Sequence, residues 1–170
     1  MLDNPLMYGL LAALAVALLV AAATDLRHRR IGNWLNAAIA LGAPLFWWAS
    51  DLPLWADPWT RNSVAMQLLV ALVTFIILAA LFAMRAMGGG DVKLLTALAL
   101  WIPPMLFLQL VIVMALLGGL LTIVFGAWHV MRRRRERLAI PYGVAIALAG
   151  LWVLGSTYAP AGMLAAGALG

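Results

Sequence analysis

Residues 64–84 read VAMQLLVALVTFIILAALFAM, 21 residues without a charged side chain. A helix of about 20 apolar residues is long enough to cross the hydrocarbon core of a bilayer, so this stretch predicts a transmembrane helix. The whole chain has the same character, with 66% hydrophobic residues, 10% charged residues and a mean hydropathy of +1.05. These values lie outside the range of soluble globular domains. The sequence therefore predicts an all-α membrane protein.

Five further apolar segments predict a bundle of about six transmembrane helices in a single domain over residues 1–170. They are Leu6–Thr24, Trp34–Trp48, Val92–Ile102, Met105–Val130 and Pro141–Tyr158. The first lacks the basic flank of a cleaved signal peptide, so we expect it to be retained. The fourth helix, Val92–Ile102, is short, about 16 Å long, so the glycines before it are expected to enter the membrane as irregular backbone beside a wet cavity. Pro103-Pro104 predicts the turn after it.

The basic residues predict how the bundle is oriented. Ten of the 11 Lys and Arg residues belong to one side of the predicted topology, and only Arg61 falls on the other. By the positive-inside rule, both termini and the loop at residues 51–62 face outward, while Asp25 and Asp91 lie on the cytoplasmic side. The net charge of +5 then reflects topology and attraction to anionic membrane lipid, and we expect no nucleic-acid partner.

Asp25 ends the first apolar segment, and Asp91 begins the fourth. Ionisable groups beside transmembrane segments are candidates for function. Two carboxylates that share one proton can hydrolyse a peptide bond, because the ionised partner activates water while the protonated partner hydrogen-bonds the scissile carbonyl. Each acid taken alone has another explanation: Asp25 as a solvated carboxylate paired with Arg29, and Asp91 as the cap of a helix after a flexible glycine turn.

Other hydrolytic chemistries lack their residues. The chain has no cysteine, and its two histidines, His28 and His129, do not form the His-Glu-x-x-His pattern of zinc proteases. None of the three serines lies in a Gly-x-Ser-x-Gly motif. We interpret His28 as an interfacial residue beside three arginines. Aspartate is the catalytic group that is left, and we expect neither a metal nor a cofactor.

Three motifs occur in order at predicted cytoplasmic helix ends. Asp25 is followed eight positions later by Asn33, then come Gly88-Gly89-Gly90-Asp91-Val92-Lys93-Leu94 and Ile140-Pro141-Tyr142-Gly143. Together they resemble the type IV prepilin peptidases, membrane aspartyl proteases of the Gly-x-Gly-Asp type. The resemblance implies that Asp25 and Asp91 are the catalytic pair.

The resemblance also implies a supporting set of residues: Gly88, Gly89, Gly90, Lys93, Asn33, Pro141, Tyr142 and Gly143. Lys93 would approach a catalytic or substrate carboxylate, or else extend its amine to the membrane interface. Residues 141–143 would line the substrate path, or else begin a helix at a permitted proline.

The chain departs from the family pattern in two places. Ile31-Gly32-Asn33 stands where the family usually has Ile-Pro-Asn, and the cysteine-containing cytoplasmic region linked to N-methylation of the pilin is missing. The chain therefore resembles the short, peptidase-only form similar to those of Flp or tight-adherence pili. The resemblance implies a bacterial inner-membrane protein whose substrate is a prepilin or pseudopilin precursor with a short basic leader, cut at the cytoplasmic face.

Two other functions would use parts of the same sequence. In a small proton-coupled transporter subunit the two aspartates would form a relay, but transport sites tend to lie near the bilayer midplane between repeated halves. In a noncatalytic assembly protein, small residues such as Gly118-Gly119 would only pack helices, which leaves the two acids unexplained. Mutation of the acids separates the three, because only the protease predicts lost cleavage.

Overall fold

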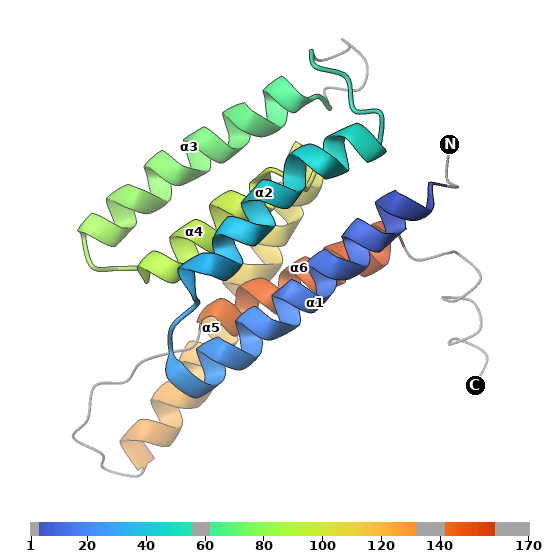
Figure 1. Cartoon of the computed structure of the whole chain (residues 1–170). Helices are drawn as coiled ribbons and strands as arrows, with labels where there is room; N and C mark the ends of the chain where they lie inside the picture. Colours follow the sequence, from blue (N-terminus) through green and yellow to red (C-terminus); the bar gives the residue numbers. More distant parts are fainter. Residues whose placement is uncertain (1–3, 56–61, 132–141, 159–170) are drawn as a thin grey trace.

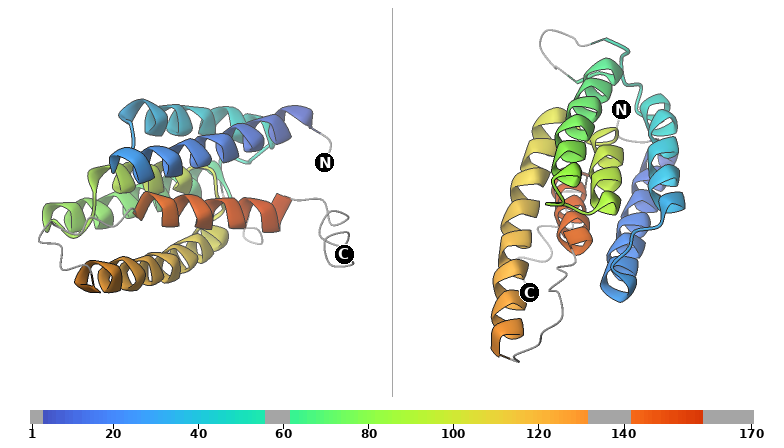
Figure 2. Two further views of the ribbon diagram at one scale, coloured as in Figure 1. Left: turned by 90° about the horizontal axis from the view of Figure 1, so that it is seen from below. Right: turned by 90° about the vertical axis from the view of Figure 1, so that its left-hand side faces the viewer.

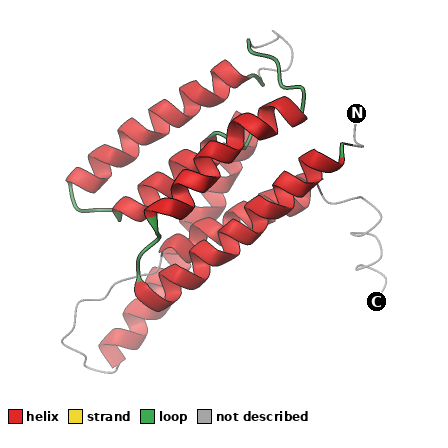
Figure 3. Cartoon of the chain, viewed as in Figure 1, coloured by secondary structure: helices red, strands yellow, loops and turns green. Residues whose placement is uncertain are grey.

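The computed structural model describes residues 4–55, 62–131 and 142–158. Over these ranges the chain forms six helices and no strand (Figures 1 and 3), which confirms the predicted all-α class. The helices are α1 (Pro5–His28), α2 (Asn33–Ala49), α3 (Val64–Ala83), α4 (Gly89–Ala99), α5 (Pro104–Met131) and α6 (Tyr142–Tyr158).

Three of these helices are long and apolar enough to cross a membrane: α1, α3 and the part of α5 from Pro104 to Val124. Helix α3 has the surface expected of a membrane-spanning helix, because only Gln67 and Ala71 of its 20 residues are buried inside the protein. Its large apolar side chains, such as Ile76, point outward and suit a lipid environment. The chain is therefore a membrane protein, while the number of crossings and their direction stay predictions.

Helix α4 lies at the centre of the bundle. It packs against α2, α3 and α6, and Figure 2 shows it between α2 and α3. Leu94, Leu95 and Leu98 are almost completely buried on it. A short helix is stable here because its neighbours cover it, so it needs no lipid-facing length of its own.

Two boundaries differ from the sequence prediction near the acids. Helix α1 continues to His28, so Asp25 lies inside its last turn rather than beyond its end. Helix α4 already begins at Gly89, and no glycine in the described ranges has a positive φ. The prediction of irregular backbone is therefore wrong for Gly89 and Gly90, which belong to the helix, whereas Gly88 is extended and holds the N-cap position. Asp91 is the third residue of that helix and does not cap it.

The turns place the ends of α1, α2 and α4 together. Arg29 adopts a left-handed conformation with φ 52°, and its N–H donates to the Asp25 carbonyl at 2.8 Å, which ends α1. Helix α2 then starts after only a short link.

The expected turn at Pro103-Pro104 is confirmed, since α5 begins with Pro104 in its first position. The buried indole N–H of Trp101 donates to the Ile39 carbonyl at 2.8 Å and fastens this turn to α2.

Candidate active site

Asp25 is held in a buried position by a helix that lies far away in the sequence. Its side chain is only 6% exposed, and its Oδ2 accepts a hydrogen bond of 2.8 Å from the backbone N–H of Gly143. Gly143 is the second residue of α6, where the first N–H groups have no partner within the helix. The end of α1 is therefore fixed to the start of α6.

Asp91 lies in the first turn of α4, outside the three candidate membrane spans. Burial is the main cause that raises the pKa of Asp91, to about 6, and the charge of Asp25 adds to it. A hydrogen bond from the Gly88 backbone opposes part of this shift.

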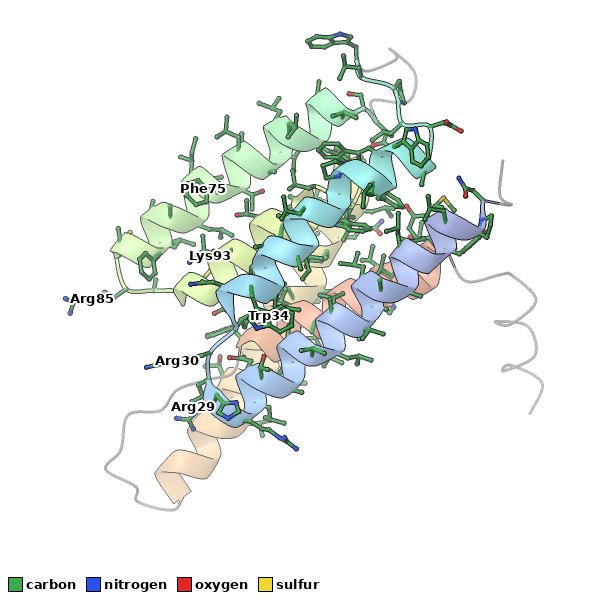
Figure 4. The ribbon with its side chains drawn as sticks, in the orientation of Figure 1. Arg29, Arg30, Trp34, Phe75, Arg85 and Lys93 are labelled. Carbon is green, nitrogen blue, oxygen red and sulfur yellow. The ribbon has the colours of Figure 1, made fainter. Side chains whose placement is uncertain are left out.

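Both carboxylates line one open pocket of about 460 Å³. The lining comes from the end of α1, the link to α2 and the first turn of α4: Asp25, Arg29, Arg30, Ile31, Gly32, Asn33, Gly88, Gly89, Gly90 and Asp91. Figure 4 shows Arg29 and Arg30 at this end of the bundle. The volume falls in the range of ligand sites, about 300–1,000 Å³. The pocket can admit water and a narrow peptide segment beside two acids.

Two glycines let the backbone come close at this site. A Cβ on Gly143 would lie 2.8 Å from Asp25 Oδ2, and one on Gly90 would lie 3.3 Å from the Ile31 Cβ. Neither glycine is needed for an unusual backbone conformation, because both are helical with negative φ. Their role is close approach, which brings α6 against the end of α1 and α4 against the link between α1 and α2.

Lys93 and Asn33 bind each other. The Lys93 amine donates to Asn33 Oδ1 at 2.8 Å, on the exposed surface between α4 and the start of α2. In this structure the Lys93 amine therefore binds an amide, and its approach to a catalytic or substrate carboxylate, or to the membrane interface, stays a prediction. Asn33 lines the pocket with the two acids, so this bond tethers one pocket wall to α4.

The neighbouring residues Tyr142 and Gly143 of the third motif lie in two different places. Gly143 reaches the pocket acids, whereas the hydroxyl groups of Tyr142 and Thr122 are 3.2 Å apart and form a hydrogen bond. The Tyr142 ring also packs close to Gly118 on α5. Tyr142 thus joins α6 to α5 and does not line the pocket, and Pro141 lies outside the described residues.

The structure adds one residue that the sequence interpretation missed. Asn36 is 5% exposed, its Nδ2 lies 3.4 Å from the Gly90 carbonyl, and its Oδ1 has no hydrogen-bond partner among the described residues. The signal was an amide one helical turn after Asn33, inside an otherwise apolar segment. Polar side chains within such segments are often functional.

Comparison with known proteins gives one match. Residues 12–126 match the model of the type IV leader peptidase family. The matched range contains both acids, the three glycines, Asn33 and Lys93, and it ends before α6. No protein of curated function and no solved structure matches the chain.

Proposed function

Because the chain belongs to the type IV leader peptidase family, we propose that it is an aspartic endopeptidase with Asp25 and Asp91 as its catalytic pair. The observation that carries the proposal is the single pocket that both carboxylates line, although they come from different helices. The raised pKa of Asp91 agrees with two acids that hold one proton between them.

In the proposed reaction the two carboxyl groups have different roles. The ionised one takes a proton from a water molecule as that water attacks the scissile carbonyl carbon, while the protonated one donates a hydrogen bond to the carbonyl oxygen. When the tetrahedral intermediate collapses, the C–N bond breaks and the leaving amine receives the proton that the carboxylate took from water, which returns the pair to one shared proton. The Gly143 N–H holds Asp25 in place during these steps. Either acid can take either role, since the proton belongs to the pair.

The proposed substrate is a prepilin or pseudopilin precursor of the Flp type. Arg29 and Arg30 line the pocket, and Lys93 and Arg85 lie at the same end of the bundle (Figure 4). Basic residues mark the cytoplasmic side by the positive-inside rule. We therefore propose that the chain works in the bacterial inner membrane and cuts the leader at the cytoplasmic face. This position matches a substrate whose scissile bond lies just outside its apolar segment.

The test is co-expression with a small pilin precursor in a host without other such peptidases, followed by gel analysis of the precursor. Asp25→Asn and Asp91→Asn should each abolish trimming while the protein still accumulates in the membrane. Asp51→Asn is the matched control, because this exposed acid lies beyond the opposite end of α2 and outside the pocket. It should trim like wild type.

Each outcome has a definite meaning. Trimming that requires both acids establishes the reaction class and the catalytic pair together. Trimming by both asparagine variants refutes the aspartic mechanism. If wild type trims none of a panel of precursors, while the acid variants change proton flux in vesicles, the relay function replaces the protease.

A further inference from the structure

The two helices that carry the candidate catalytic acids have little direct contact with each other. In the described part of the chain, α1 packs on α6 and α2, whereas α4 packs mainly on α3, α2 and α6 (Figure 1). Asp25 lies in the last turn of α1, and Asp91 lies in the first turn of α4. The distance between the acids is therefore set by what lies between these two helix ends.

Ile31 lies in the link between α1 and α2, and it lines the pocket that contains both acids. Its side chain is only 8% exposed, whereas Arg29 and Arg30 directly before it are exposed. The link therefore turns one apolar side chain inward, toward the space between the helix ends.

Ile31 contacts α4 at the glycine that precedes Asp91. A Cβ on Gly90 would lie 3.3 Å from Ile31 Cβ, 3.5 Å from its backbone N and 3.6 Å from its Cγ1. Because glycine has no Cβ, the backbone of α4 can come this close. The base of the Ile31 side chain thus packs against α4 one residue before the acid.

Ile31 contacts α6 at the glycine that binds Asp25. A Cβ on Gly143 would lie 2.9 Å from Ile31 Cδ1, and the Gly143 N–H donates to Asp25 Oδ2 at 2.8 Å. The tip of the same side chain thus lies against the first turn of α6. Ile31 therefore lies between two glycines that are each connected to one acid, Gly90 by a peptide bond and Gly143 by a hydrogen bond.

We propose that Ile31 is a positioning residue that fixes the separation of Asp25 and Asp91, because its side chain fills the space between the first turns of α4 and α6. This inference rests on the proposed function and adds a residue that acts on the reaction only through the two acids. Packed interiors transmit such displacements, because close-packed side chains leave few voids. A displacement of about 1 Å at a reacting group can lower a rate about 100-fold.

The first test is cleavage of a precursor peptide in detergent micelles. Ile31→Ala removes the Cγ1 and Cδ1 atoms that contact the two helices, and it should lower kcat about 10- to 100-fold, with KM within about twofold of wild type. Ile39→Ala is the matched control, because Ile39 is 3% exposed on α2 and does not line the pocket. It deletes the same atoms, so it should also lower the thermal midpoint, while its kcat stays within about twofold of wild type.

Ile31→Leu separates the shape of this side chain from its burial. Leucine keeps the volume and the apolar character but moves one methyl group from Cβ to the tip of the side chain, which lies near Gly143. Such a swap changes stability little, so the thermal midpoint should stay near that of wild type, whereas kcat should fall about fivefold or more. A wild-type kcat for Ile31→Leu overturns the proposal, because burial alone would then be sufficient. A higher KM at unchanged kcat also overturns it, because Ile31 would then be a substrate contact.

The second test does not depend on cleavage. Burial, and then the charge of Asp25, raise the pKa of Asp91. In Ile31→Ala, water that enters the vacated space and a wider separation of the acids should both lower the pKa of Asp91. Carboxyl ¹³C NMR in micelles measures this titration, with Asp91→Asn to assign the signal and Ile39→Ala as the control. An unchanged titration midpoint in Ile31→Ala overturns the proposal.

The proposed function and the role of Ile31 can fail separately. If wild type cleaves the precursor while the Ile31 variants behave like the Ile39 control, only the positioning role is overturned. If wild type does not cleave it, the proposed function fails, and the titration of Asp91 in Ile31→Ala still decides whether Ile31 fixes the two acids.

Discussion

Replacement of Gly143 by alanine should damage the site while leaving the helix intact. The new Cβ would lie 2.8 Å from Asp25 Oδ2 and 2.9 Å from its Cγ. Ordinary contacts begin at 3.4 Å, so the carboxylate and α6 must separate by about 0.6 Å. The same shift lengthens the hydrogen bond from the Gly143 N–H. Alanine itself favours the helix over glycine, by about 0.5–1 kcal/mol, so the local backbone is not the weak point.

We expect Gly143→Ala to lower kcat/KM for precursor cleavage about 10- to 100-fold, because a misplacement of about 1 Å at a reacting group can cost that much. The assay is the initial rate of cleavage per amount of enzyme in the membrane. Gly155→Ala is the control, since it lies on the same helix and its Cβ would meet nothing within 4 Å. It should behave like wild type.

The reasoning is refuted if Gly143→Ala accumulates normally and cleaves within about twofold of wild type. The thermal midpoint of both variants is measured alongside. The new Cβ would also lie 2.9 Å from Ile31 Cδ1. A large drop in the midpoint for Gly143→Ala alone would therefore assign the loss of activity to unfolding rather than to a misplaced carboxylate.

Three further predictions concern the pocket and its edge. Since burial, and then the charge of its partner acid, raise the pKa of Asp91 to about 6, the shared proton is lost above that pH, and kcat/KM should fall as pH rises through 6. Gly32→Pro should keep the fold and raise the free energy of unfolding by about 0.4–1 kcal/mol, because φ −63° and ψ 136° suit proline and only the exposed Trp34 indole must move. Lys93→Met and Asn33→Leu should be non-additive in thermal unfolding, with a coupling of about 0.5–1 kcal/mol from their exposed hydrogen bond.

The measurements that would contradict these three are direct. A pH–rate profile that stays level from pH 5 to 8 would mean that no shared proton is needed. A lower unfolding midpoint for Gly32→Pro would show that the link requires a free backbone at this position. Strict additivity of the Lys93 and Asn33 variants would mean that their bond contributes nothing measurable.

Much of the helical framework could be predicted from the sequence. The segment Val64–Met84 became α3, Val64–Ala83, and Pro103-Pro104 does separate α4 from α5. These predictions succeed because apolar length and proline act locally on the chain. The glycines before Asp91 were harder to interpret, because glycine permits both a loop and a helix. In the folded chain Gly90 packs closely against Ile31, a contact that no local pattern reveals.

The roles of the polar side chains depended on their neighbours. The partner of the Lys93 amine is Asn33, which lies on another helix. Tyr142 and Gly143 are adjacent in sequence, yet one binds Thr122 on α5 and the other binds Asp25 on α1. Successive residues of a helix point in different directions, so a motif read as a unit can be divided between two neighbours.

By itself the sequence determined that this chain is an all-α membrane protein of a peptidase type, with two acids at helix ends, because hydropathy, helix length and short motifs are properties of neighbouring residues. Only the tertiary structure decided that Asp25 and Asp91 line one pocket, that α6 donates a backbone hydrogen bond to Asp25, and that Lys93 binds Asn33. The physical reason is that these arrangements depend on how each helix is rotated and how closely it packs, and residues far apart in the chain set both.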